Sequence, residues 1–230
     1  MNELRSAFNE LQYGGAMVYP LLFLGIVAVL IILDRAVAYS RCLRLPRPLE
    51  ELVETYGFVW DELDRQLAAL APVNVYRRFF EVISDNRNKP AWWVESRAGD
   101  EAGDIDKSLG RGLWILETVV TAAPLLGLLG TITGMMQAFK VIGGSGLVAP
   151  TQVTSGVAQA LISTALGLLI ALFALFGFNF FARIQSQARD HLERLGSKLI
   201  DHIRLDEETD GKETVASVTP LASREGRVKR

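Results

Sequence analysis

Three long stretches without a charged residue constrain this chain more than any other feature of its sequence. They run from Ala16 to Leu33, from Thr118 to Phe139 and from Val141 to Ala182. About 20 apolar residues in a helix cross the hydrocarbon core of a bilayer, so each stretch is long enough for one span. The sequence therefore predicts an all-α membrane protein with three transmembrane helices, in contact with the lipid bilayer.

Composition and motifs exclude several other classes of protein. A net charge of -2 gives no broad basic surface, so no nucleic acid partner is expected. There is no phosphate-binding loop and no nucleophile elbow, and the two histidines, His191 and His202, lie near the C-terminal end. We therefore expect no enzyme activity, no metal site and no cofactor. The single cysteine, Cys42, cannot form an intramolecular disulfide.

The first apolar stretch has an alternative interpretation as a cleaved signal peptide. Ala36, Val37 and Ala38 have the small-x-small pattern of a cleavage site. The residues before the stretch, however, include Glu3 and Glu10 rather than a basic cluster. A retained membrane anchor is the better interpretation.

Lysine and arginine are distributed unequally at the ends of the three stretches. They gather after the first, before the second and after the third, as Arg35, Arg41, Arg44, Arg47, Lys107, Arg111, Arg183, Arg189, Arg194 and Lys198. Basic flanks mark the cytoplasmic side of a membrane protein. The sequence predicts an N-terminus outside the cytoplasm and a C-terminus inside it, which in a bacterium with two membranes would be a periplasmic N-terminus and a cytoplasmic C-terminus.

Hydropathy and helical periodicity together divide the chain into eight segments. These are a short periplasmic amphipathic segment at 1–15, the first span at 16–40, a cytoplasmic helical region at 41–111, the second span at 112–141, a periplasmic turn at 142–152, the third span at 153–182, a cytoplasmic helical extension at 183–205 and a disordered tail at 206–230. The cytoplasmic region is small for an independent core, so we expect it to pack on long cytoplasmic extensions of the second and third spans.

Small residues recur every three or four positions in the second and third spans. With Pro124, they are Gly127, Gly130, Gly134, Gly156, Ala160 and Gly167. Such stripes let helix backbones approach closely in lipid. They predict helix packing, either within one subunit or between subunits.

Polar side chains lie beside these stripes at membrane depth. The candidates for an ion path or pore lining are Thr131, Thr164, Gln159 and Ser163. A lone threonine in a membrane helix often bonds its own preceding carbonyl, whereas the amide of Gln159 should face protein or water. Glu117, near the cytoplasmic end of the second span, is simply explained by snorkelling or by pairing with Arg111 or Lys107. A titrating carboxylate at the midplane would therefore have to come from another chain.

Two sequence motifs carry a family resemblance. Residues 123–131 read Ala-Pro-Leu-Leu-Gly-Leu-Leu-Gly-Thr, and residues 156–168 read Gly-Val-Ala-Gln-Ala-Leu-Ile-Ser-Thr-Ala-Leu-Gly-Leu. They resemble the second-helix and third-helix signatures of the ExbB/TolQ/MotA proton channel family, and the layout is most similar to ExbB. The resemblance covers about residues 110–183. A MotA-like stator would be expected to have four spans.

The resemblance implies a homo-oligomer, specifically a pentamer, in the bacterial inner membrane. It further implies an ExbD/TolR-like single-span partner that supplies a membrane aspartate, and a TonB-like protein that receives the work of the proton motive force. Thr131 and Thr164 match the family's pore threonines, whereas Gln159 stands where many ExbB sequences carry glutamate. A TolQ-like role in envelope maintenance and a passive membrane scaffold are the alternative functions.

Overall fold

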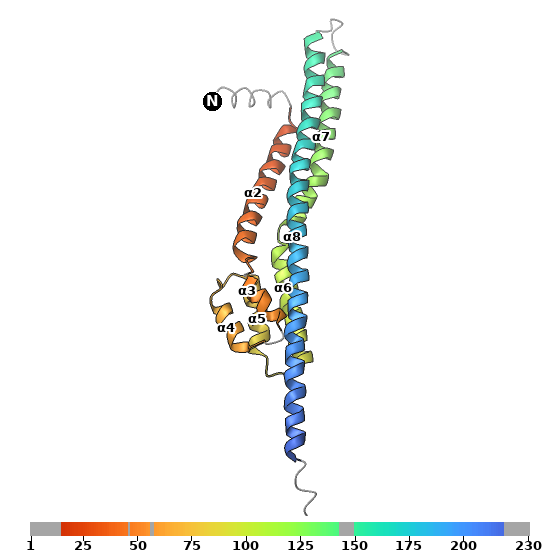
Figure 1. The fold of residues 1–230 in the computed structure, drawn as a ribbon. Helices are drawn as coiled ribbons and strands as arrows, with labels where there is room; N and C mark the ends of the chain where they lie inside the picture. The colour runs from red at the N-terminus through yellow and green to blue at the C-terminus, as the bar shows by residue number, and fades with distance from the viewer. Residues whose placement is uncertain (1–14, 46, 56–57, 143–149, 219–230) are drawn as a thin grey trace, which may run out of the picture. The chain divides into compact units, whose positions relative to one another are not determined.

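The computed structural model describes residues 15–45, 47–55, 58–142 and 150–218, and every regular element among them is an α-helix. The helices are α2 (Val18–Cys42), α3 (Arg47–Glu54), α4 (Trp60–Ala68), α5 (Val75–Asp85), α6 (Ala91–Leu109), α7 (Leu113–Ile142) and α8 (Pro150–Val218) (Figure 1). They form two compact units, one of residues 1–38 and 110–184 and the other of residues 39–109 and 185–230. The first is called the membrane unit and the second the polar unit below.

Three of these helices are long and apolar enough to cross a membrane: Val18–Cys42, Leu113–Lys140 and Val153–Thr209. This confirms the prediction of an all-helical chain with three candidate spans. The predicted segments 1–15 and 142–152 lie mostly outside the described residues. At the other end, α8 remains helical as far as Val218, past residue 205, where the sequence pattern places the end of the helical extension.

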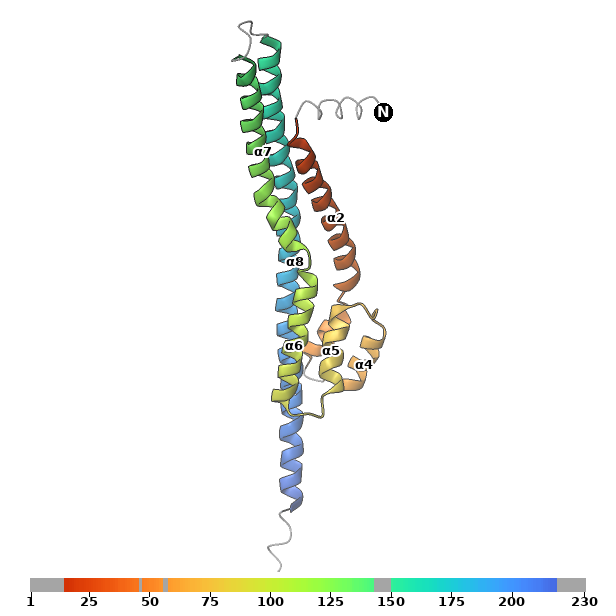
Figure 2. The ribbon, with the colours of Figure 1, turned by 180° about the vertical axis from the view of Figure 1, so that it is seen from behind.

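The membrane unit is built on α7 and the first part of α8, which lie side by side in both views (Figures 1 and 2). Small buried residues line their contact, so the two backbones nearly touch. A Cβ atom placed on Gly134 would lie 2.9 Å from the carbonyl oxygen of Gly156, and one placed on Gly156 would lie 2.8 Å from the Cβ of Ala138. The predicted small-residue stripes thus face each other within a single subunit.

Helix α2 packs on a different side of α8. Gly25 of α2 faces Ile170, and Ile32 of α2 faces Gly177. Between these contacts lies an apolar groove of about 370 Å³. Large apolar side chains such as Phe23 (65% exposed) point away from the subunit, as expected for a helix that contacts lipid.

The polar unit contains α3, α4, α5, α6 and the second part of α8. Its core is formed by the apolar stripes of these helices, among them Leu63, Phe80, Ile83, Ile105, Leu195 and Leu199, all fully buried. Asn74 begins α5 by accepting backbone hydrogen bonds from Tyr76 and Arg77, and its amide donates to the Arg44 carbonyl at 2.6 Å. This cap joins the segment after α2 to the start of α5.

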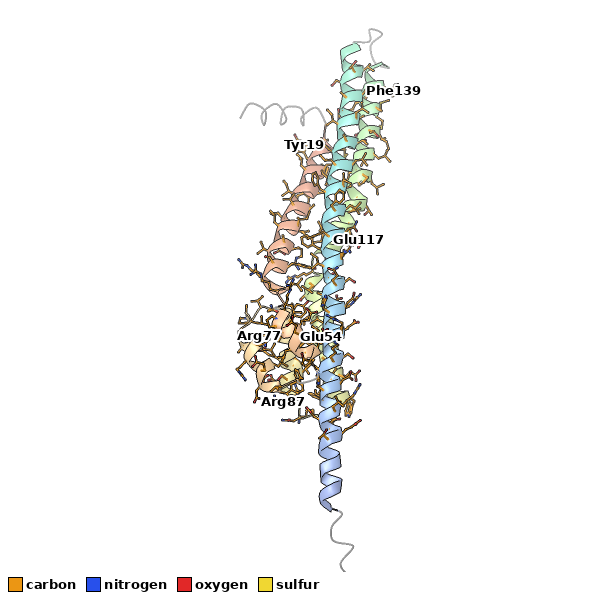
Figure 3. All side chains as sticks on the ribbon, in the orientation of Figure 1. Tyr19, Glu54, Arg77, Arg87, Glu117 and Phe139 are labelled. Atoms are coloured by element: carbon orange, nitrogen blue, oxygen red, sulfur yellow. The ribbon has the colours of Figure 1, made fainter. Side chains whose placement is uncertain are left out.

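Ion pairs on the rim of this core connect α8 to the shorter helices. Arg194 pairs with Glu50 and, at 2.7 Å, with Glu54 of α3, while Arg204 pairs with Glu95 of α6 at 2.8 Å. Figure 3 labels three charged residues of this unit: Glu54 of α3, Arg77 of α5 and Arg87 in the turn after α5. Within the polar unit, the short helices therefore pack on the second part of α8.

Candidate functional site

Thr131 and Thr164 lie at one edge of the α7–α8 contact, and both are half-buried. The Thr131 hydroxyl donates to the Leu128 carbonyl of its own helix at 2.6 Å. The Thr164 hydroxyl donates across the helix pair to the Gly127 carbonyl at 3.2 Å. Two hydroxyls from different helices thus converge on adjacent carbonyls of the same turn of α7. Thr131 and Thr164 are together called the threonine edge below.

Glycines make this convergence possible. A Cβ on Gly127 would lie 3.0 Å from the Ser163 carbonyl oxygen and 3.2 Å from the Thr164 Cα. One on Gly167 would lie 2.5 Å from the Ala123 carbonyl oxygen. Without side chains at these positions the backbones approach closely enough for a short hydroxyl to reach the other helix.

The chemistry available at this edge follows from how each hydroxyl uses its hydrogen-bonding groups. A threonine hydroxyl has one proton to donate and two lone pairs that accept. The two protons are used on Leu128 and Gly127, so the lone pairs can accept from a protonated carboxyl or from water. By rotating, each hydroxyl can instead donate to a carboxylate. A threonine pair of this kind can bind either form of a titrating acid, although it does not titrate itself.

Ser163 is placed differently from the two threonines. It has no exposed surface, packs against Gly130 of α7 and donates a hydrogen bond to the Gln159 carbonyl at 3.0 Å. Its hydroxyl therefore lies inside the contact of α7 and α8 within this subunit.

Gln159 lies on the side of α8 that carries α2. Its amide packs against Gly15, just before α2, and Gly15 has a φ of +71°. Ile170 and Gly177, the α8 residues that face α2, are 11 and 18 positions further on, which returns to nearly the same side of the helix. Thr164 is five positions on, about 140° around at roughly 100° per residue. The structure thus brings Thr131 and Thr164 together and separates Gln159 from them.

The sequence does not predict the hydrogen bond from Thr164 of α8 to the Gly127 carbonyl of α7. Thr118, Thr121, Thr131 and Thr133 each bond a carbonyl three or four residues earlier, as a lone membrane threonine usually does. Thr164 instead bonds the other helix. The only signal in the sequence is the matching of small positions between the two stripes, which does not by itself fix their register.

Pro124 lies within α7, three residues before Gly127. Because proline has no N–H, it cannot donate to the Val120 carbonyl. That leaves the Val120 carbonyl without its usual donor, about two turns before the carbonyls that Thr131 and Thr164 bond, on a half-buried stretch of helix. Such breaks in a membrane helix are tolerated where water or protein can satisfy the freed carbonyl.

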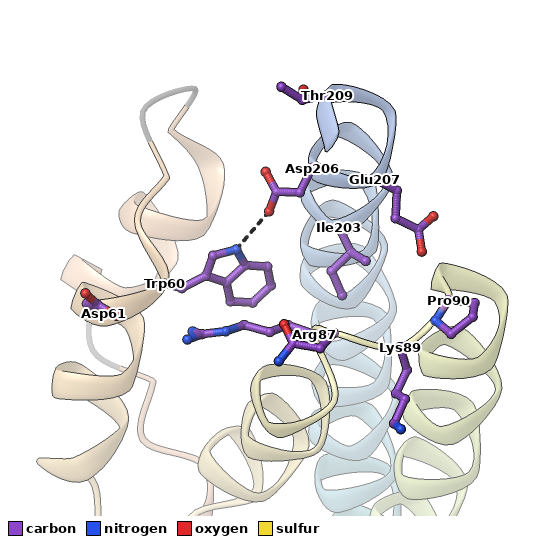
Figure 4. A pocket seen from close by; sticks show the side chains of 10 residues that line it. Trp60, Asp61, Arg87, Lys89, Pro90, Ile203, Asp206, Glu207 and Thr209 are labelled. Atoms are coloured by element: carbon purple, nitrogen blue, oxygen red, sulfur yellow. Dashed lines mark hydrogen bonds between the residues drawn. The ribbon is translucent and has the colours of Figure 1, made fainter. Parts of the chain in front are cut away.

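The polar unit has a larger cleft, of about 850 Å³, that offers a competing site (Figure 4). Several of its polar groups take part in contacts between helices. Trp60 donates to Asp206 at 3.1 Å, Glu207 accepts from the Ala91 backbone N–H at 3.0 Å, and Arg87 lies over the Trp60 ring. These contacts hold α4, α6 and α8 together. Within the described residues no cluster of histidine, cysteine and carboxylate side chains could hold a metal ion.

The chain has relatives among known proteins. The chain is 34% identical over 214 residues to a biopolymer transport protein, ExbB-like 1, of Synechocystis, covering 83% of this chain and 76% of the relative. It is 40% identical to ExbB of Aquifex aeolicus over 79 residues, which cover 34% of this chain and 53% of that protein. It is 38% identical to TolQ of Haemophilus influenzae over 73 residues, about a third of each chain.

The family match is broader than the two signature motifs. It extends over residues 73–194, from the α5 region of the polar unit through both α7 and the first part of α8. The protein is thus a multi-pass membrane protein, and by this match the chain belongs to the MotA/TolQ/ExbB proton channel family.

Proposed function

We propose that this chain forms the housing of a proton-driven motor that energises transport across the envelope of a bacterium. A single-span partner of the ExbD/TolR kind supplies a membrane aspartate, which takes up protons outside and releases them inside. A TonB-like protein receives the resulting work. The observation that carries this proposal is the convergence of the Thr131 and Thr164 hydroxyls on one turn of α7.

The need for a partner follows from the spans themselves. Between Thr118 and Ala182 the sequence has no aspartate, glutamate or histidine, and its single charge is Lys140. Threonine and glutamine do not exchange protons near neutral pH. Proton transfer through the part of the spans beyond Glu117 therefore requires an acid from another chain. Members of the family are channels and not enzymes, so no chemical reaction on a substrate is involved.

Assembly is proposed to bring several copies together so that their threonine edges enclose the partner helix. The outer surfaces of α7 and α8 carry large exposed apolar side chains, such as Leu125, Met136 and Leu161, each 66% exposed. In the membrane these contact lipid, neighbouring subunits or the partner. We propose a pentamer in the inner membrane, with the N-terminus in the periplasm and the C-terminus in the cytoplasm, as the basic flanks indicate. As pore-lining residues, Gln159 and Ser163 remain predictions.

Proton flux into liposomes tests the proposal. The chain is co-reconstituted with its candidate partner, and an internal pH dye reports flux under an imposed gradient. We expect Thr131→Val and Thr164→Val to reduce flux by about tenfold or more each, because they remove hydroxyls that bind the titrating acid. The matched variants Thr131→Ser and Thr164→Ser keep the hydroxyls and should retain most of the flux.

Unchanged flux in both valine variants would overturn the assignment of these residues to the ion path. If the wild-type complex passes no protons at all, the passive scaffold becomes the better interpretation. The match to TolQ keeps envelope maintenance as a second candidate role. Purification of the chain with either a TonB-like or a Tol-type protein from its native membrane would decide between those two roles.

A further inference from the structure

Glu117 is a charged residue inside a candidate span without a salt-bridge partner among the residues that the structure describes. It is the fifth residue of the α7 span and is exposed on the surface of the membrane unit, where Figure 3 labels it. Within the membrane unit, no ion pair joins Glu117 to Arg111, the basic residue nearest to it in the sequence. Its position therefore needs an explanation other than charge pairing.

Glu117 belongs to a polar row on the same side of α7 as the threonine edge. Thr121, Pro124 and Thr131 are 4, 7 and 14 positions further along, which places all of them within about 40° of Glu117 around the helix. Each contributes a polar group: the Thr121 hydroxyl, the Val120 carbonyl that Pro124 leaves without its usual donor, and the Thr131 hydroxyl. The row extends about 21 Å along the helix axis.

The other helices of the membrane unit add little charge at this level. Gly177 of α8 lies close to Ile32 of α2 and to Leu116, the residue before Glu117. From Thr151 to Ala182 α8 has no charged residue, and its first one is Arg183. On α2, Asp34 and Arg35 pair with each other at 2.6 Å, and Arg41 lies in the last turn. Arg111, just before α7, is the nearest charged residue to Glu117 in the sequence on the N-terminal side.

We propose that Glu117 is the inner proton-release group of the channel, taking protons that reach the threonine edge and passing them to cytoplasmic water along the polar row of α7. This inference rests on the proposed function. When the partner's acid deprotonates, its proton moves to water in the row. The Glu117 carboxylate binds that proton, forming a neutral carboxylic acid, and then releases it to water on the cytoplasmic side. No charge accumulates, because each proton accepted is released before the next arrives.

The test uses the co-reconstituted complex with variants Glu117→Gln and Glu117→Asp. Glutamine keeps the shape and removes the exchangeable proton, whereas aspartate keeps the carboxylate one methylene shorter. Asp104→Asn, an exposed acid of α6 outside the span, removes the same charge elsewhere and serves as the matched control. Flux is measured while the pH is varied only on the side of the membrane at which α7 begins. Purification of the partner and the melting temperature are recorded for every variant.

We expect Glu117→Gln to lower flux by about tenfold or more and to flatten its dependence on the inner pH. Glu117→Asp and Asp104→Asn should keep both the flux and the pH profile near those of the wild type. If the wild type passes protons and the flux of Glu117→Gln equals that of the wild type, the inference is overturned and the proposed function stays intact. Loss of the partner from Glu117→Gln but not from Glu117→Asp would show a residue that holds the assembly by ion pairing, which also overturns it. Absence of flux from the wild type would instead contradict the proposed function itself.

Discussion

The hydroxyl of Thr164 donates a hydrogen bond to the backbone carbonyl of Gly127, 37 residues earlier in the chain, at 3.2 Å. Thr131, one turn further along α7 from Gly127, donates to the adjacent carbonyl of Leu128. The two side chains are thereby fixed on the same turn. This geometry depends on the absence of a side chain at Gly127, since a Cβ there would lie 3.2 Å from the Thr164 Cα.

Substituting alanine for the glycines of the α7–α8 contact should destabilise the membrane unit. In Gly167→Ala the new methyl would lie 2.5 Å from the Ala123 carbonyl oxygen, and in Gly134→Ala 2.9 Å from that of Gly156. Because backbone atoms cannot rotate away, the helices must separate, at a cost of roughly 1–3 kcal/mol for each substitution. Thermal unfolding of the full chain in detergent should show a lower melting temperature for both variants.

Helix α6 supplies matched controls for these substitutions. Gly99 and Gly103 lie in the interior of this helix, and a Cβ on either would meet nothing within 4 Å. Alanine has a higher helix propensity than glycine by up to about 1 kcal/mol, so Gly99→Ala and Gly103→Ala should leave the melting temperature unchanged or raise it. If the α6 variants lowered the melting temperature as much as Gly134→Ala and Gly167→Ala do, the close approach of α7 and α8 would be contradicted.

The contact of Gln159 with Gly15 should be detectable as coupling between the two residues. Gly15→Ala meets two obstacles: the φ of +71°, which disfavours any L side chain, and the Gln159 amide, which occupies the space of the new methyl. Replacing Gln159 by alanine removes the second obstacle and leaves the first. The double variant should therefore be more stable than the sum of the single effects predicts, by about 0.5–1 kcal/mol. Strict additivity of the melting shifts would place the Gln159 amide elsewhere.

The extent to which the sequence predicts this structure differs between spans and site. The three charge-free stretches identify the membrane helices because no soluble core tolerates runs of that length without charge. The apolar stripes of Leu63, Phe80 and Leu195 likewise identify the helices of the polar unit. These features depend only on local spacing.

The arrangement of the polar residues in the spans depends on helix register, which spacing alone does not reveal. Gln159, Ser163 and Thr164 are close in the sequence, yet one lies against Gly15, one inside the α7–α8 contact and one at its edge. Positions five apart on a helix differ by about 140°, so the face of each is decided by which neighbour packs where. The small-residue stripes leave packing within and between subunits equally possible. The contacts of Gly134 with Gly156 and of Gly167 with Ala123 show that they join helices within one subunit.

Ion pairing and burial should contribute unequally to the attachment of α8 in the polar unit. Arg194 pairs with Glu50 and Glu54, but its side chain is 45% exposed, so water and salt screen the attraction. We expect Arg194→Ala to cost no more than about 1 kcal/mol, less at high salt. Its neighbour Leu195 is fully buried, and Leu195→Ala should cost about 2–5 kcal/mol whatever the salt concentration. Melting temperatures at low and high salt would distinguish the two, and a large salt-sensitive loss in the leucine variant would contradict this division.

Tyr76 should make the polar unit sensitive to alkaline pH. Burial, reinforced by the negative charge of Glu50, raises the pKa of the Tyr76 phenol above its ordinary value of 10.0. Above about pH 10 the unfolded chain loses this proton whereas the folded chain keeps it, so the unfolded state binds fewer protons and stability falls as pH rises. Below that pH the phenol is neutral in both states and contributes no pH dependence.

Tyr76→Phe keeps the ring and removes the titrating group. Its stability should therefore fall less steeply than that of the wild type above about pH 10, by up to about 1.4 kcal/mol per pH unit between the two pKa values of the wild-type residue. Tyr19→Phe, at a tyrosine that is 72% exposed in the membrane unit, controls for the loss of a hydroxyl and should follow the wild-type curve. Denaturant midpoints followed by tryptophan fluorescence between pH 8 and pH 11 provide the measurement. Parallel curves for wild type and Tyr76→Phe would mean that this phenol is not held neutral by burial in the folded chain.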